Sequence, residues 1–115
     1  MAVPPEISTL IDQLERELDQ IEQEATAGVS LVRSLLSRFP DNIRLIQFFT
    51  AFNNALLFVE ISRRRIQATI ERLSAPDILD EEIQEAGEDL VTLMGQLIEV
   101  KIGGRRILSS LEQMQ

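Results

Sequence analysis

The chain has 115 residues, of which 44% are hydrophobic, 26% charged and 4% aromatic, and its formal net charge is −8. This length favours one domain, spanning residues 1–115, and a composition low in aromatic residues is typical of helices. Because cysteine and histidine are absent, the composition excludes disulfides, thiolate metal sites and the usual general base.

Prolines divide the chain into three segments of similar length, and each proline site is followed at once by an acid: Glu6, Asp41 and Asp77. A carboxylate at a helix start accepts from free backbone N–H groups and meets the positive end of the helix dipole. We therefore expect three long helices, at about residues 5–39, 41–74 and 78–114.

In the first segment, apolar or small residues recur at alternating spacings of three and four. They are Ile7, Ile11, Leu14, Leu18, Ile21, Ala25, Gly28, Val32, Leu35 and Phe39. Spacing of this kind, continued over four to five heptads, predicts coiled-coil-like helix packing.

The second segment repeats the pattern with Leu45, Phe49, Phe52, Leu56, Val59, Arg63, Ile66, Ile70 and Leu73. Arg63 is the one charged residue in this seam, where an unpaired charge is costly, so we expect it to form salt bridges with Glu17 and Asp89. Further apolar residues lie on the side away from the seam: Leu57, Phe58 and Ile61.

The third segment has the seam Ile83, Ala86, Leu90, Leu93, Leu97, Val100, Gly104, Ile107, Leu111 and Met114. A second stripe, spaced four, three and four, is Val91, Gly95, Ile98 and Ile102. The adjacent Gly103 and Gly104 leave open whether the helix breaks there, because each glycine costs about 1 kcal/mol relative to alanine.

The linkers are short, so neighbouring helices must be antiparallel, which predicts an all-α, up-down-up bundle of three long helices. In this register Phe52 lies level with Gly28, and Phe49 lies close to Gly103 and Gly104. Large rings would then pack against small residues. Phe39, Phe49 and Phe52 are accordingly expected in the core.

The apolar residues outside the two seams are expected at mid-bundle, on one continuous outer surface. They are Leu57, Phe58, Ile61, Val91, Gly95, Ile98 and Ile102. Because such a surface is an aggregation hazard when left in water, we expect a second copy to cover it, so that a homodimer completes the core.

A basic surface is expected near the first turn, at Arg38, Arg44, Arg105 and Arg106. We expect no aromatic side chain among these charges, and the negative net charge disfavours nucleic acid. The arginine run at residues 63–65 is interpreted as internal charge matching. An anionic partner at the basic surface remains an alternative.

The acidic run "DEEIQEAGED" places Glu82, Glu85 and Asp89 on one helical face. It resembles the E-E-x-x-E pattern of all-α nucleotide pyrophosphohydrolases, which implies Mg²⁺ binding and nucleotide hydrolysis. The match is partial, because those enzymes need a second acidic motif and only Glu99 and Glu112 follow Asp89.

The sequence therefore predicts a non-enzymatic helical protein–protein interaction module, an adaptor, regulator or assembly factor that forms a homodimer and contacts another protein. We expect no catalytic, cofactor-binding or metal-binding residue. No run of 18 uninterrupted apolar residues and no apolar leader is found, so the expected location is cytoplasmic, without a membrane span.

Overall fold

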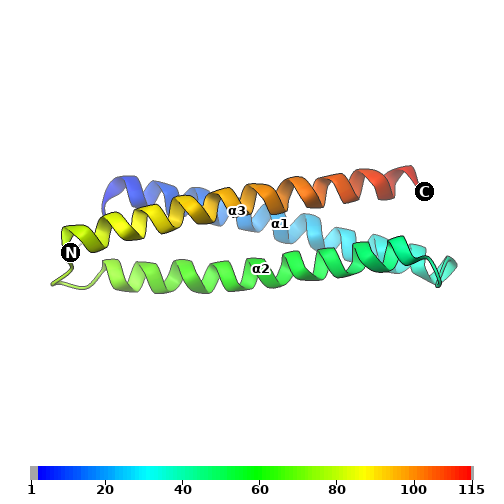
Figure 1. The fold of residues 1–115 in the computed structure, drawn as a ribbon, viewed down its shortest axis with the longest axis horizontal. Coiled ribbons are helices and arrows are strands. Elements are labelled where there is room, and N and C mark those ends of the chain that lie inside the picture. The colour runs from blue at the N-terminus through cyan, green and yellow to red at the C-terminus, as the bar shows by residue number, and fades with distance from the viewer. Residues whose placement is uncertain (1–2, 115) are drawn as a thin grey trace.

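The computed structural model describes residues 3–114, which form three helices. These are α1 (Pro5–Arg38), α2 (Ile43–Leu73) and α3 (Asp80–Gln113). Consecutive helices run in opposite directions, and the two termini lie at opposite ends of the rod (Figure 1). The bundle measures 58 × 18 × 16 Å. The predicted all-α, three-helix architecture is confirmed.

The helix starts differ in detail from the expected ones. The side chain of Asn42 caps α2, where its Oδ1 accepts from the Leu45 backbone N–H at 3.1 Å. Asp41 and Asp77 both lie outside the helices, and α3 begins with its own acids, Asp80, Glu81 and Glu82. A short amide or carboxylate in the extended residue just before a helix reaches the free N–H groups best, so Asn42 displaces Asp41 from this role. Helix α3 continues through Gly103 and Gly104 without a break.

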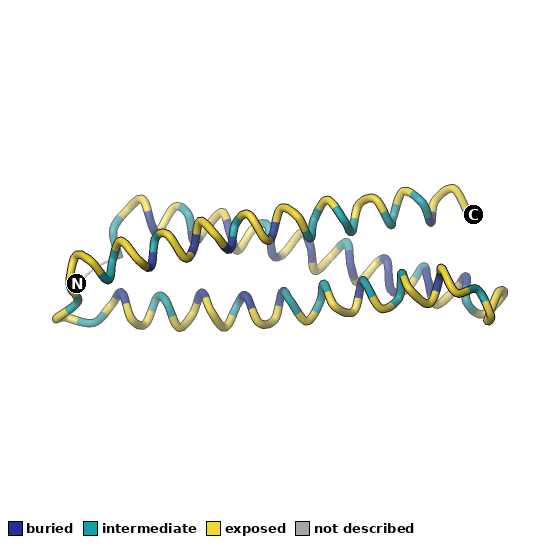
Figure 2. Tube along the Cα trace, viewed as in Figure 1, coloured by how far each residue is buried: buried dark blue, intermediate teal, exposed yellow. Residues whose placement is uncertain are grey.

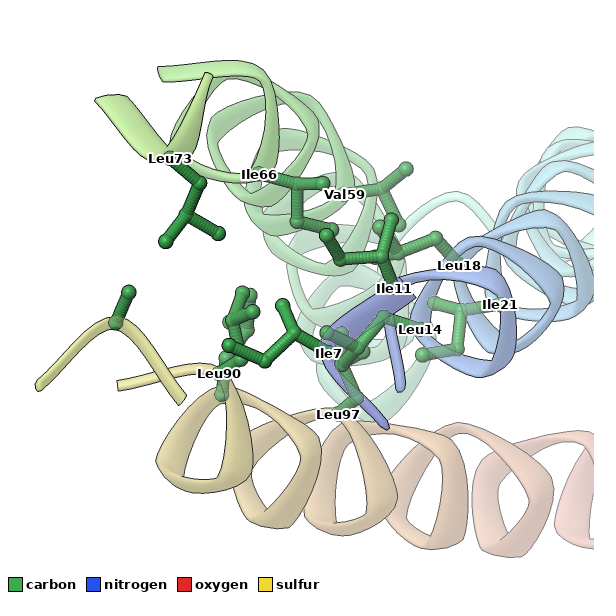
Figure 3. Packing of buried hydrophobic residues seen from close by; sticks show 12 residues of the cluster. Ile7, Ile11, Leu14, Leu18, Ile21, Val59, Ile66, Leu73, Leu90 and Leu97 are labelled. Atoms are coloured by element: carbon green, nitrogen blue, oxygen red, sulfur yellow. The ribbon is translucent and has the colours of Figure 1, made fainter. Parts of the chain in front are cut away.

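The core lies between the three helices and falls into two clusters along the rod. Figure 2 shows the buried positions recurring on the inward side of each helix, and Figure 3 shows the cluster nearer the α2–α3 turn, with side chains of all three helices meeting at the centre. That cluster is Ile7, Ile11, Leu14, Leu18, Ile21, Val59, Ile66, Leu73, Ala86, Leu90, Leu93 and Leu97. The second, nearer the α1–α2 turn, is Ala25, Val29, Val32, Leu35, Leu45, Phe52 and Leu111.

The ring of Phe52 packs directly against Gly28, as the sequence predicts. Phe52 is buried, and a methyl group added at Gly28 would lie 2.6 Å from Phe52 Cε1, far inside van der Waals contact. The glycines of α3 do not play the expected part, because nothing lies within 4 Å of a methyl group at Gly103 or Gly104.

Two of the phenylalanines expected in the core are less buried than Phe52. Phe49 is half-buried and packs at the edge of the second cluster. Phe39 is 48% exposed, because α1 ends at Arg38 and leaves this ring in the turn. The expectation that Phe39 belongs to the core is therefore wrong.

The seam of α2 carries Ser62, whose side chain is buried, and Arg63 lies beside it, facing α1. Arg63 donates to Glu22 at 2.6 Å and to Asp19 at 2.8 Å. The hydrogen bond to Glu22 is the main cause that raises the pKa of Arg63, with smaller contributions from Asp19. A salt bridge of Arg63 was expected, but the prediction that Glu17 and Asp89 are its partners is wrong.

Ion pairs also join α1 to α3. Lys101 Nζ lies 2.7 Å from Glu17 Oε2, and Arg105 Nε lies 2.9 Å from Glu24 Oε1. The first pair is the better shielded of the two, with both side chains mostly covered. Glu17 does not reach Arg63 because its side chain points toward α3, where it pairs with Lys101.

Candidate functional site

The second stripe of α3 is exposed to solvent. Val91 is 61% exposed, Ile98 45% and Ile102 47%. Gly95 is exposed as well, and nothing lies within 4 Å of a methyl group built on it. Spacings of four, three and four residues keep all of these on one helical face. In the described chain α3 therefore carries an apolar strip that its own bundle does not cover.

This strip borders the groove between α1 and α3, which contains two hollows. One hollow lies toward the α2–α3 turn, and its lining includes Ile7, Leu10, Gly87 and Val91. The other lies toward the C-terminal end of α3, and its lining includes Gln13, Met94, Ile98, Lys101 and Ile102. The exposed side chains of α3 thus stand beside depressions on the same face of the rod.

The three surface residues predicted on α2 differ in their exposure to solvent. Leu57 and Ile61 are exposed. Phe58 is half-buried and packs against the first core cluster, where it lines a groove between α2 and α3 with Val100 and Gly103. The expectation that Phe58 faces away from the core is wrong, since the ring turns sideways toward α3.

The exposed residues of α2 and α3 do not line a common groove. Ile98 and Ile102 border α1, whereas the groove between α2 and α3 is lined on the α3 side by other residues, among them Val100, Gly104 and Ile107. The expected single continuous surface is therefore replaced by two separate ones. We call the Val91, Gly95, Ile98 and Ile102 set the α3 strip.

The arginines near the α1–α2 turn lie over phenyl rings. The guanidinium carbon of Arg33 is 5.7 Å from the centre of the Phe49 ring, that of Arg38 is 5.6 Å from Phe39, and that of Arg44 is 5.3 Å from Phe48. Distances in this range are typical of cation–π contacts. The expectation that no aromatic side chain accompanies these charges is wrong.

Within residues 3–114, no acid lies at ion-pair distance from Arg33, Arg38, Arg44 or Arg106. Arg105 differs from the other predicted members of the basic surface, because it is paired with Glu24. The basic surface that has no acidic partner within the described chain is therefore Arg33, Arg38, Arg44 and Arg106.

The two halves of the rod differ strongly in charge. Residues 25–58 and 96–114 form the half next to the α1–α2 turn and carry six basic and three acidic residues. Residues 3–24 and 59–95 form the other half and carry five basic and sixteen acidic residues. The molecule is thus a rod with a basic end and a strongly acidic end.

The acidic start of α3 contains Glu82, Glu85 and Asp89, the candidates for magnesium binding. In residues 3–114, acidic side chains form no group of three that is placed to hold a metal ion. The acids of the first turn lie where they stabilise the helix dipole. No observation on these residues favours the magnesium-hydrolase alternative.

Helix α2 is long and apolar enough to cross a membrane by length and composition alone, with a mean hydropathy of 1.3 over 18 residues, of which 22% are buried. The same helix supplies buried residues to both core clusters, among them Leu45, Phe52, Val59 and Ile66. With only 22% of the window buried, packing in the bundle accounts for part of this composition.

Comparisons with protein-family models, with curated proteins and with solved structures found no match. The fold and the surfaces together define a class, an elongated three-helix bundle with an uncovered apolar strip and segregated charge.

Proposed function

We propose that this chain is a non-enzymatic protein–protein association module that forms a homodimer through the α3 strip. The observation that carries the proposal is the exposure of Val91, Ile98 and Ile102 in a row on one face of a small rod. Contiguous exposed apolar side chains mark interaction sites. An adaptor or assembly role follows from this, with the remaining faces free for another protein.

A second copy fits this surface because the rod is charged oppositely at its two ends. Two rods lying side by side in opposite directions bring the basic end of each against the acidic end of the other. Charge complementarity of this kind favours the antiparallel pair of rods and disfavours the parallel pair. A closed two-fold pair also covers the strip of both copies, since a two-fold interface joins a patch to itself.

The expected association is reversible. Fully burying an aliphatic side chain of this size contributes about 1.5–3 kcal/mol, and these side chains are already partly covered. A pair would bury six of them, while association itself costs about 4–15 kcal/mol in lost freedom of motion. The gain and the cost are of similar size, so we expect a weak dimer that dissociates on dilution.

Ile98→Glu is expected to convert the dimer to the monomer mass of 13.0 kDa, because it buries an unpaired carboxylate near the centre of the interface. Light scattering at about 100 times the wild-type dissociation constant measures this. The control is Ile43→Glu at the start of α2, where the isoleucine is 71% exposed against 45% for Ile98, and this change should leave the dimer mass unchanged. A wild type that stays monomeric at high concentration contradicts the proposal.

The arginines over the phenyl rings favour a second candidate function, recognition of an anionic partner at the basic end. Stacking on a ring holds a guanidinium in place while its N–H donors stay free. Heparin serves as the probe. Retention at low salt should fall when Arg38 and Arg44 are both changed to Ala, but not when Arg64 and Arg65, which lie in the acidic half, are changed. Absence of wild-type retention contradicts this candidate.

A further inference from the structure

The α3 strip has a symmetry that its spacing reveals. A two-fold axis that runs beside α3 and perpendicular to it, level with the midpoint between Gln96 and Leu97, brings together residues at equal distances from that midpoint: Val91 with Ile102 and Gly95 with Ile98. The spacing of four, three and four residues reads the same in both directions. We infer that two copies pair through their α3 helices in antiparallel orientation about this axis, with Val91 against Ile102 of the second copy and Gly95 against Ile98; the inference rests on the proposed homodimer.

Shape favours this register. Gly95 is exposed and has open space around it, so the side chain of Ile98 from the second copy finds room where a larger residue would hold the helices apart. At either end, Ile102 of one copy lands beside Val91 of the other, next to the hollow lined by Leu10 and Gly87. Val91 in turn meets the hollow beside Ile102. Ile98 therefore opposes a glycine, and each pair of Val91 with Ile102 lies beside a hollow.

Charge favours the same register. The axis that pairs the α3 strip also brings Glu88 of one copy opposite Arg105 of the other, once at each end of the contact. Glu88 is exposed, and Arg105 is more than half exposed despite its contact with Glu24. The acidic first part of α3 thus faces the basic part at Lys101–Arg106, and opposite charges across an interface fix its orientation.

A parallel pair makes the opposite contacts. It would bring Gly95 against Gly95, which leaves a gap between the two helices. About one turn further along, Ile98 would meet Ile98, and these two large side chains would hold the helices apart. It would also place Glu88 against Glu88 and Arg105 against Arg105. Like charges in register cost free energy, so the parallel pair is disfavoured by packing and by charge.

The chain has no cysteine, so a disulfide can form only between cysteines that are introduced, and it shows which positions lie close together in the dimer. Helix axes about 8–10 Å apart bring facing Cα atoms within disulfide reach. An equimolar mixture of Val91→Cys and Ile102→Cys, oxidised mildly, is expected to give mainly the mixed disulfide, identified by mass. Each variant alone should give little dimer. Both positions are exposed, so circular dichroism should show an unchanged fold.

A mixture of Leu57→Cys and Ile61→Cys is the matched control for pairing through α2, and it should stay unlinked. Self-linked Val91→Cys or Ile102→Cys overturns the antiparallel register, as does a linked α2 control. A wild type that is dimeric by light scattering while the α3 mixture stays unlinked overturns this inference and leaves the homodimer standing. A monomeric wild type overturns both.

Discussion

Gly28→Leu is expected to lower the free energy of unfolding by about 3 kcal/mol or more, because overpacking a core costs about 1–3 kcal/mol and here the whole side chain meets a ring. Even a methyl group at this position would lie 2.6 Å from Phe52 Cε1. Thermal unfolding at one fixed protein concentration measures the effect, which should lower the midpoint by roughly 10 °C or more.

The control for this prediction is Gly103→Ala on α3, where a methyl group has nothing within 4 Å. That change should stabilise the protein by about 0.5–1 kcal/mol, because alanine is the better helix former. If Gly28→Leu unfolds at the wild-type temperature, the contact between α1 and α2 at this level is wrong.

Phe52→Ala is expected to be as damaging, at about 3–5 kcal/mol, because it leaves a cavity in a buried layer. Phe52 is 1% exposed, and the residue opposite is a glycine, which has no side chain to move into the space. Chemical denaturation measures the loss in the free energy of unfolding. An unchanged m-value would show that the substitution changes stability and not the surface exposed on unfolding.

The coupling between these positions separates the contact from general destabilisation. In a Phe52→Leu background, Gly28→Ala should cost at least about 1 kcal/mol less than in the wild type, since the smaller side chain leaves room for the methyl group. Strictly additive effects would mean that the two positions do not touch.

The contact between Gly28 and Phe52 was predictable because short connections restrict the register of antiparallel helices. The linker between α1 and α2, residues 39–42, leaves little freedom along the rod. The apolar spacing then orients each helix about its own axis, so a glycine and a ring at the same level on facing seams must meet. The exposure of the α3 strip followed from the same spacing.

Contacts beside the seams were not predictable to the same degree. Relative to the orientation that the apolar spacing predicts, α2 is rotated slightly about its own axis, so that Ser62 is the buried residue. Arg63 then lies on the α1 side, where its long side chain reaches Asp19 and Glu22. The same rotation turns Phe58 toward α3. Spacing describes which residues share a face, but the exact rotation depends on packing between all three helices.

The stacking of arginines on phenyl rings near the α1–α2 turn was missed for a related reason. The sequence contains a signal, since Arg38 precedes Phe39 directly and Arg44 precedes Phe48 by one helical turn. Residues four apart on a helix are neighbours, so the second contact follows from spacing alone. The contact of Arg33 with Phe49 joins two helices and requires the structure.

In the proposed dimer, two rods lie side by side in opposite directions, joined at the middle of α3. Small-angle X-ray scattering of the wild-type chain tests this arrangement most directly, because it reports mass and length together. The predicted particle has twice the 13.0 kDa mass of one chain and a length close to the 58 Å of a single rod. A mass of one chain, or a particle roughly twice 58 Å long, would contradict the account.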